Sequence, residues 1–146
     1  MKEIVELREI IEKKIKDLNY PTSPSSLYDP IRYVLSLPAK RIRPVLLLLS
    51  HQMFDDDLEE ALFPAIAIEV FHNFTLLHDD IMDNAPLRRG KQTVHERWGE
   101  NVAILSGDVM MIHAHQLLAK TKSKKIKEVF SVFAEAAVKV CEGQQL

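Results

Sequence analysis

The segment LLHDDIMDNAPLRRG, from Leu76 to Gly90, places three carboxylates and two arginines directly after an apolar run. If the first part of this segment is helical, Asp79 and Asp83 lie one turn apart on the same face, with Asp80 beside them. Neighbouring carboxylates repel one another unless a cation lies between them. Oxygen ligands from few side chains suit Mg²⁺, which keeps water molecules and shares its remaining positions with substrate phosphates. The spacing therefore predicts a Mg²⁺ site, and a solvated acidic helix end is the alternative interpretation.

The two arginines at the end of this segment extend the prediction. Arg88 follows Asp83 by five residues, so a short loop can return both guanidinium groups over the metal. Guanidinium groups match phosphate oxygens with paired hydrogen bonds. Carboxylates for Mg²⁺ and arginines together indicate a diphosphate site. The alternative is that Arg88 and Arg89 only form ion pairs with the aspartates.

A second basic cluster, Lys40, Arg41 and Arg43, lies upstream in PAKRIRP. Pro44 suits the first turn of a helix, so the cluster falls at a predicted helix N-terminus. Free N–H groups and the helix dipole attract anions at such a terminus. The cluster is therefore a second candidate anion site, although basic residues before a helix are usually solvated.

His72 precedes Asp79 by seven residues, which places both on one helix face about two turns apart. From the spacing alone, a buried core histidine is the preferred interpretation. Glu69 and His72 also form an E-x-x-H pattern like that of di-iron bundles, but those bundles need two such pairs and the chain has one. His113 and His115 are interpreted as structural or surface residues.

Apolar residues recur every three or four positions through most of the chain, which is typical of amphipathic helices. The prolines and serines of PTSPSS indicate a loop, and Pro38 ends a helix. There is no alternation typical of strands and no internal repeat, so the predicted class is all-α. The predicted helices cover residues 4–18, 26–37, 44–54, 58–82, 101–119 and 124–142, and residues 85–99 are predicted to form a loop.

Two of these helices carry more specific expectations. The helix that begins at Pro44 is nearly all apolar and is expected to lie inside the fold. Pro64 lies within the next helix and is expected to kink it or to delay its start, because proline cannot donate a backbone hydrogen bond.

The bulk composition excludes several classes of protein. The 146 residues suffice for one domain, and 47% of them are hydrophobic. A net charge of −2 gives no general attraction to nucleic acid or anionic membranes. Cys141 is the single cysteine, so no intrachain disulfide and no cysteine-based zinc site forms, and we expect a cytoplasmic location. The first residues are too charged for a signal peptide, and no apolar run suggests a membrane span.

Three passages, KRIRP, LLHDDIMDNAPLRRGKQTVH and AILSGDVM, resemble the trans-isoprenyl diphosphate synthases, the polyprenyl synthetase family. Their order, spacing and flanks agree, and the similarity runs from about Leu27 to the end. The resemblance implies an all-α bundle around a deep apolar pocket. It also implies head-to-tail condensation of an allylic diphosphate with isopentenyl diphosphate, in a homodimer formed through the helices after Asn101.

The resemblance also implies roles for individual residues. Asp79, Asp80 and Asp83 match the first aspartate-rich motif, which binds Mg²⁺ and through it the allylic diphosphate. The matching residues for diphosphate contacts are Arg88 for the allylic substrate, and Lys40, Arg43, His72 and Arg89 for isopentenyl diphosphate. With this match, the resemblance implies that His72 contacts the diphosphate, in place of the interpretation as a buried core histidine.

The sequence departs from the family pattern in two places. Pro38 and Ala39 stand where the family usually has two glycines, so any backbone contact from that turn to phosphate is in doubt. A second aspartate-rich motif is missing, and the DDD of residues 55–57 precedes the first motif and cannot replace it. We therefore expect residues 1–146 to be a single-domain N-terminal part of a synthase, inactive by itself and prone to self-association.

Two other functions stay open at this point. One is a non-catalytic partner subunit of a heteromeric prenyl synthase, for which a missing second motif would be natural. The other is a structural helical module. The set of aspartates and arginines argues against a purely structural role, because packing does not require it.

The resemblance also indicates product length. The residues four and five positions before Asp79 act as the pocket floor in similar enzymes, and here they are Thr75 and Phe74. Phe71, one turn below Thr75, is a possible second floor. This pattern resembles geranylgeranyl-type enzymes, so we predict a C20 product, with C15 next.

Overall fold

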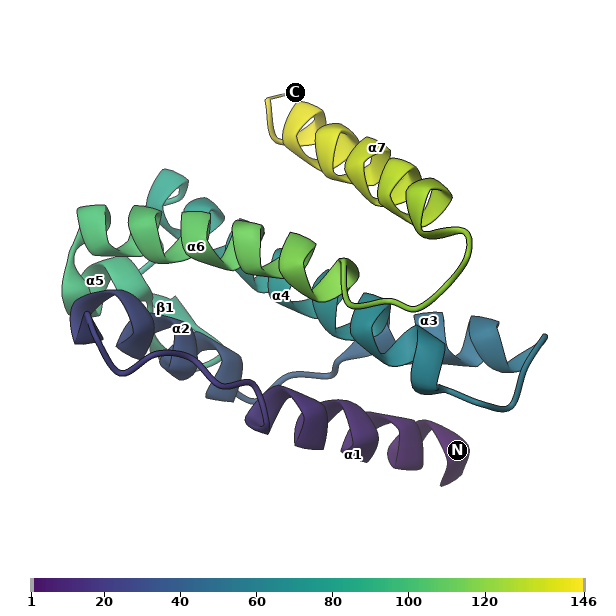
Figure 1. The fold of residues 1–146 in the computed structure, drawn as a ribbon. Helices are drawn as coiled ribbons and strands as arrows, with labels where there is room; N and C mark the ends of the chain where they lie inside the picture. Colours follow the sequence, from purple (N-terminus) through teal and green to yellow (C-terminus); the bar gives the residue numbers. More distant parts are fainter. Residues whose placement is uncertain (1, 146) are drawn as a thin grey trace.

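The structure is a computed structural model that describes residues 2–145. These residues form seven helices and one short hairpin (Figure 1). The helices are α1 (Lys2–Lys16), α2 (Ser25–Ser36), α3 (Ile42–Gln52), α4 (Glu59–Met82), α5 (Val94–Trp98), α6 (Glu100–Leu118) and α7 (Ile126–Gln144). The hairpin strands are β1 (Leu87–Arg88) and β2 (Lys91–Gln92). The predicted all-α class is confirmed.

Helices α4 and α6 form the centre of the fold and run in opposite directions (Figure 1). Small buried residues recur at helical spacing on α6, at Ala103, Gly107 and Ala114. They let α6 approach the apolar face of α4, where Ile66 and Val70 are fully buried. The contact positions α4, which carries Asp79, Asp80 and His72, against α6.

Helix α4 is also the one helix among residues 2–145 whose length and apolar composition would allow it to cross a membrane. Half of its most apolar window, 50%, is buried inside the fold. The core helix of a soluble protein passes the same test, so this is weak support for a span. The helix continues through Pro64, which therefore does not delay its start.

Helix α1 packs its predicted apolar stripe, Leu7, Ile11 and Ile15, against α3 and α4. Helix α3 differs from the expectation that it lies wholly inside. Leu48 is fully buried, but Leu46 is 56% exposed. Only one face of α3 packs against its neighbours, so an apolar helix here presents its other face outward.

The segment 85–99, predicted to be a loop, contains the hairpin and α5 instead. Each strand has only two residues, too few for an alternating pattern to show in the sequence. Arg89 and Gly90 form the turn with φ angles of 54° and 75°, the left-handed pair that tight hairpins use. The buried Thr93 closes the base of the hairpin, because its hydroxyl donates a 2.7 Å hydrogen bond to the Ala85 carbonyl.

Helix α7 stands apart from the rest of the molecule (Figure 1). None of its residues is buried among those the structure describes. It meets the body of the fold mainly through aromatic contacts, such as the ring of Phe133 against Phe71 at 5.3 Å between centroids. The space between α7 and the body is one of the two cavities described below.

Candidate functional site

A cavity of about 540 Å³ lies at the start of α3, and basic side chains dominate its wall. The hairpin tip reaches it from the other side, so residues far apart in the sequence share one space. Its lining includes Arg8, Lys40, Arg43, His72 and Arg89, together with Pro38, Ala39, Ile42 and the Arg41–Glu69 pair. The structure thus brings together all four residues assigned to isopentenyl diphosphate by resemblance.

Arg41 is the exception within this basic cluster, because its side chain turns into the core. The residue is 2% exposed and its backbone is left-handed, with φ 51°. Its guanidinium donates to Glu69 Oε1 at 2.7 Å, to Glu12 Oε1 at 2.9 Å and to the Leu35 carbonyl at 2.8 Å. Burial opposes the charge of Arg41, but the two glutamates keep its pKa raised. Arg41 therefore holds the turn and is not available to a ligand.

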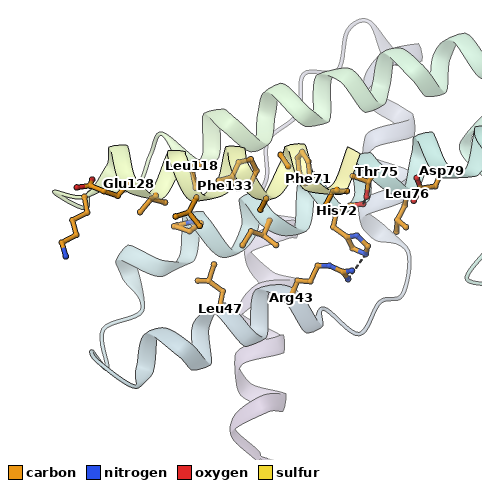
Figure 2. A pocket seen from close by; sticks show the side chains of 18 residues that line it. Arg43, Leu47, Phe71, His72, Thr75, Leu76, Asp79, Leu118, Glu128 and Phe133 are labelled. Atoms are coloured by element: carbon orange, nitrogen blue, oxygen red, sulfur yellow. Dashed lines mark hydrogen bonds between the residues drawn. The ribbon is translucent and has the colours of Figure 1, made fainter. Parts of the chain in front are cut away.

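Arg43 and His72 form a contact on the wall of the cavity, with 3.2 Å between Arg43 Nη1 and His72 Nε2 (Figure 2). Arginine has no acceptor, so Nε2 of His72 must accept this hydrogen bond and carry no proton. The pKa of His72 agrees, because burial and then the charge of Arg43 lower it from its ordinary value. Neutral His72 thereby orients Arg43.

Arg89 sits at the tip of the hairpin turn, where its left-handed backbone directs it toward the same cavity. Burial and then the charge of Arg41 lower its pKa. A guanidinium group that is partly buried near another cation is stabilised when an anion lies beside it. This is the arrangement expected of a phosphate-binding residue.

The three aspartates of the cluster differ in their partners. Asp80 is held by Arg88, whose Nε lies 2.8 and 2.9 Å from the two carboxylate oxygens. Within residues 2–145, no group of three acidic or histidine side chains is placed to hold a metal. Asp79 and Asp83 remain on one face without an ion pair among the described residues.

Two carboxylates still fit Mg²⁺, which needs only one or two of them when substrate phosphates supply further oxygens. The pKa of Asp79 is raised, first by burial and then by repulsion from Asp83 and Asp80, although Arg88 opposes the shift. A cation between Asp79 and Asp83 would relieve that repulsion. The donor set fits a metal shared with a phosphate ligand and not a closed protein site.

A second, larger cavity of about 830 Å³ lies between α3, α4 and α7. Asp79 lies at one end, and apolar side chains continue from it along α4 (Figure 2). The wall includes Leu47, Ile68, Phe71, Thr75, Leu76, Leu118, Val129, Val132, Phe133 and Val140. The cavity can therefore hold an apolar chain whose charged end meets the aspartates.

The two cavities meet at Arg43 and His72, which line both. A basic site for one anion thus adjoins an apolar site with carboxylates at its mouth. Two different anionic ligands can lie side by side in this arrangement, one of them with a long apolar tail.

A sequence model of the polyprenyl synthetase family matches residues 24–146. The short chain isoprenyl diphosphate synthase of Methanocaldococcus jannaschii is 42% identical over 95% of this chain and 43% of its own length. The chain belongs to the polyprenyl synthetase family. The geranylgeranyl pyrophosphate synthase of Geoglobus acetivorans is 41% identical over 92% of this chain. The chain spans less than half the length of these curated relatives, 43% in each case.

Solved structures agree with this membership of the polyprenyl synthetase family. A crystal structure of a geranylgeranyl pyrophosphate synthase superposes with a TM-score of 0.93 at 48% identity, over 97% of this chain and 43% of the other. The geranylgeranyl pyrophosphate synthetase of Pyrococcus horikoshii gives a TM-score of 0.92 at 39% identity, over 99% of this chain and 45% of the other. The family fold is therefore shown.

Of the residues assigned to the pocket floor in this family member, Thr75 and Phe71 line the apolar cavity, and Phe74 is not part of its lining. The Phe74 ring packs against Phe71 and His78, at 5.3 and 4.8 Å between centroids. It faces α6 at Gly107, where an added Cβ would lie 3.5 Å from the ring and 2.6 Å from His78 Nε2. Phe74 therefore supports Phe71 from behind.

Sequence reasoning missed the partners of Arg41. Glu69 was noticed only as half of an E-x-x-H pattern, and Glu12 was not noticed at all. A buried acid in the middle of an apolar helix was the available signal, since such a group needs a cationic partner. His113 and His115 both form hydrogen bonds within the fold: the Tyr20 hydroxyl lies 2.7 Å from His113 Nδ1, and His115 Nδ1 donates to the Met111 carbonyl at 2.8 Å.

Proposed function

We propose that this chain forms the N-terminal part of a short-chain prenyltransferase that condenses an allylic diphosphate with isopentenyl diphosphate. The observation that carries the proposal is the meeting of the two cavities at Arg43 and His72. An allylic diphosphate suits the apolar cavity, with its diphosphate at Asp79. Isopentenyl diphosphate suits the basic cavity, and the two substrates are then neighbours, as a bimolecular reaction requires.

The aspartates and Arg88 would serve the departure of the allylic diphosphate. The C–O bond breaks with its electron pair moving to the diphosphate, so negative charge grows at the mouth of the apolar cavity. Asp79 and Asp83 would hold Mg²⁺, which when bound neutralises such charge. Arg88 adds fixed positive charge at the same place, while Asp80 keeps the guanidinium oriented.

The basic cavity would hold the second substrate. Lys40, Arg43, His72 and Arg89 bind the isopentenyl diphosphate so that its double bond attacks the allylic carbon, after which a proton passes to the released diphosphate. The apolar wall keeps water away from the allylic cation, which would otherwise be trapped as an alcohol.

We propose a C20 product, with C15 as the next choice, and a floor formed by Phe71 and supported by Phe74. In the full-length enzyme, Phe71→Ala should lengthen the products most, because Phe71 lines the cavity. Phe74→Ala should lengthen them less, by letting Phe71 move. Chromatography of the prenyl products tests this, and an unchanged distribution in both variants would show that the floor lies elsewhere.

The binding part of the proposal can be tested on the 146-residue chain by titration calorimetry. We expect saturable binding of isopentenyl diphosphate, weakened by Arg43→Gln, and Mg²⁺-dependent binding of farnesyl diphosphate, weakened by Asp79→Asn. Failure of both ligands to bind would overturn the proposed function. We expect no turnover when both ligands are present, and product formation from labelled isopentenyl diphosphate would contradict the proposed inactivity of the chain.

We also propose that the protein is a homodimer, with an interface that includes α6. Leu105 and Ile112 are seven residues apart on one face of α6 and are 58% and 55% exposed. Exposed apolar patches of this kind mark association surfaces. Sedimentation at micromolar concentration tests this, and a clean monomer would contradict it.

A further inference from the structure

Arg8 lines the basic cavity, although it belongs to α1 and lies before the residues that the family model matches. None of the ligand-binding roles proposed above involves α1. The side chain therefore adds a cationic group to the cavity from a helix outside the family motifs, and the contacts of α1 explain how it comes to lie there.

An ion pair fixes α1 against the turn that carries Lys40 and leads into α3, whose first residues include Arg43. Glu12 accepts a 2.9 Å hydrogen bond from Nε of the buried Arg41 in that turn. Arg8 precedes Glu12 by one helical turn, so the two share a face of α1. Long side chains on a helix lean toward its N-terminus. Arg8 therefore extends beyond the Glu12–Arg41 contact, along the wall of the cavity.

The charges of the cavity are unbalanced. Among residues 2–145, Arg8, Lys40, Arg43 and Arg89 make no ion pair with a carboxylate. Glu69 is the single acid in the lining, and its charge is taken up by Arg41 at 2.7 Å. A cavity with several unpaired cations and no free carboxylate selects a ligand that carries more than one negative charge.

The backbone that lines the cavity offers fewer N–H donors than a turn before a helix usually does. Pro38 lines the wall and has no N–H, so it cannot donate to a phosphate oxygen. Side chains therefore have to supply a larger share of the donors for a diphosphate. Arg8 brings a guanidinium group to this same cavity, whose lining includes Pro38 and Ala39.

We infer that Arg8 is a further binding residue for the diphosphate group of the ligand in the basic cavity, placed there by the Glu12–Arg41 ion pair. The inference rests on the proposed function, since it assigns this cavity to isopentenyl diphosphate. Because Arg8 is exposed and makes no ion pair among the described residues, its replacement should weaken ligand binding without unfolding the chain.

Titration calorimetry of the 146-residue chain with isopentenyl diphosphate tests the inference. Arg8→Gln should weaken binding about threefold to tenfold, within the range of one charge-assisted hydrogen bond at an exposed site. Lys16→Gln removes the same charge from the same helix, outside this cavity, and should leave binding unchanged. Arg8→Lys should recover part of the loss. The thermal midpoint without ligand should be the same for the parent, Arg8→Gln and Lys16→Gln.

The outcomes separate the inference from the proposed function. If Arg43→Gln weakens binding while Arg8→Gln behaves like Lys16→Gln, the inference is overturned and the function stands. Equal weakening by Arg8→Gln and Lys16→Gln would show a general charge effect and also overturn it. If the parent chain does not bind isopentenyl diphosphate at all, the proposed function fails and the inference fails with it.

Discussion

Two turns approach helix α4, one formed by residues 38–43 where the chain enters α3 and one formed by the hairpin, and each carries two arginines. In the turn before α3, Arg41 binds Glu69 of α4. In the hairpin, Arg88 binds Asp80 of the same helix. The second arginine of each pair lines the basic cavity. One arginine of each pair thus anchors its turn to α4, and the other, Arg43 or Arg89, lines the basic cavity without an acidic partner among the described residues.

The two anchors differ in burial. The Arg41 side chain is 1% exposed and the Glu69 side chain 3%. The Arg88 side chain is 28% exposed, while its partner Asp80 is 6% exposed. Arg41 has a second acid, Glu12, and a backbone carbonyl as further partners. Arg88 has solvent on one side, so a ligand oxygen can reach it without breaking its contact with Asp80.

This difference suits the Arg41–Glu69 pair to a structural role and the Arg88–Asp80 pair to the proposed ligand contact. A buried pair is costly to separate, because each ion left alone has lost its water. A pair open to solvent can add a further partner, so it suits a substrate contact. The four predictions that follow separate these two roles, from the largest expected effect to the smallest.

Arg41→Ala should have the largest effect on stability. The substitution leaves Glu69 buried without its main partner. The free energy of unfolding should fall by about 3–5 kcal/mol, as is typical when one partner of a buried ion pair is removed. Denaturant unfolding measures this change. The double replacement Arg41→Met with Glu69→Leu should recover much of the loss, because it removes the orphaned charge. A loss below about 1 kcal/mol for the single variant would place Arg41 in the same class as a surface arginine.

Arg88→Ala should act mainly on the ligand. Mg²⁺-dependent binding of farnesyl diphosphate should weaken about tenfold to a hundredfold, the scale of a hydrogen bond to a charged group. The loss of stability should be less than half that of Arg41→Ala, since water can reach the freed Asp80 from the exposed side. Calorimetry and denaturant unfolding of the same sample compare the two, and an effect on stability alone would give Arg88 a purely structural role.

Arg89→Lys should have a smaller effect, on the neighbouring cavity. Lysine keeps the charge but cannot offer a paired fork to phosphate oxygens. We expect isopentenyl diphosphate to bind about threefold to tenfold more weakly, a change near 1 kcal/mol. Binding of farnesyl diphosphate serves as the internal control and should not change. Equal weakening of both ligands would show that the hairpin as a whole has moved.

The smallest effect should come from His72, whose pKa responds to the arginine charges of both turns. Its folded pKa is lowered by burial and by Arg43, with smaller contributions from Arg89 and Arg88. The unfolded chain therefore takes up a proton first as the pH falls below about 6.5, and stability decreases from there until the lowered pKa is reached.

His72→Gln should make the dependence of stability on pH shallower. The difference in free energy of unfolding between the parent and the variant should change by less than about 1 kcal/mol from pH 7.5 to pH 5.5. Denaturant unfolding at pH 7.5 and pH 5.5 measures the difference. His113, whose pKa is also lowered by burial, contributes a background that is common to the parent and the variant. Identical pH profiles for the two proteins would show that the charges of the turns do not act on His72.

The helices could be predicted from the sequence because their signals are local, and apolar spacing gave most of them to within a few residues. The order of basic and acidic groups marked residues that the structure brings together at the two cavities, and their binding of ligands stays a prediction. The different directions of Arg41 and Arg43 could not be predicted. They depend on a left-handed backbone at Arg41 and on a glutamate on another helix, 28 positions along the chain.

The orientation of Phe74 was beyond sequence reasoning for a similar cause. The helical position of Phe74 indicated a place beside the cavity wall. The ring turns away from the cavity because Gly107 on α6 has no side chain and leaves room for it and for His78. The hairpin likewise left no periodic pattern in its two-residue strands.

The close approach of His78 to Gly107 also bears on how product length could be changed in the proposed enzyme. A methyl group there would come within 2.6 Å of His78 Nε2, so the imidazole would have to swing aside and give up the 3.3 Å hydrogen bond that it donates to the Ile104 carbonyl. The Phe74 ring, in contact with His78, would lose its rigid backing. In the proposed enzyme, product length would then respond to a mutation at Gly107, a position outside the lining of the apolar cavity, and a search confined to cavity-lining positions would overlook it.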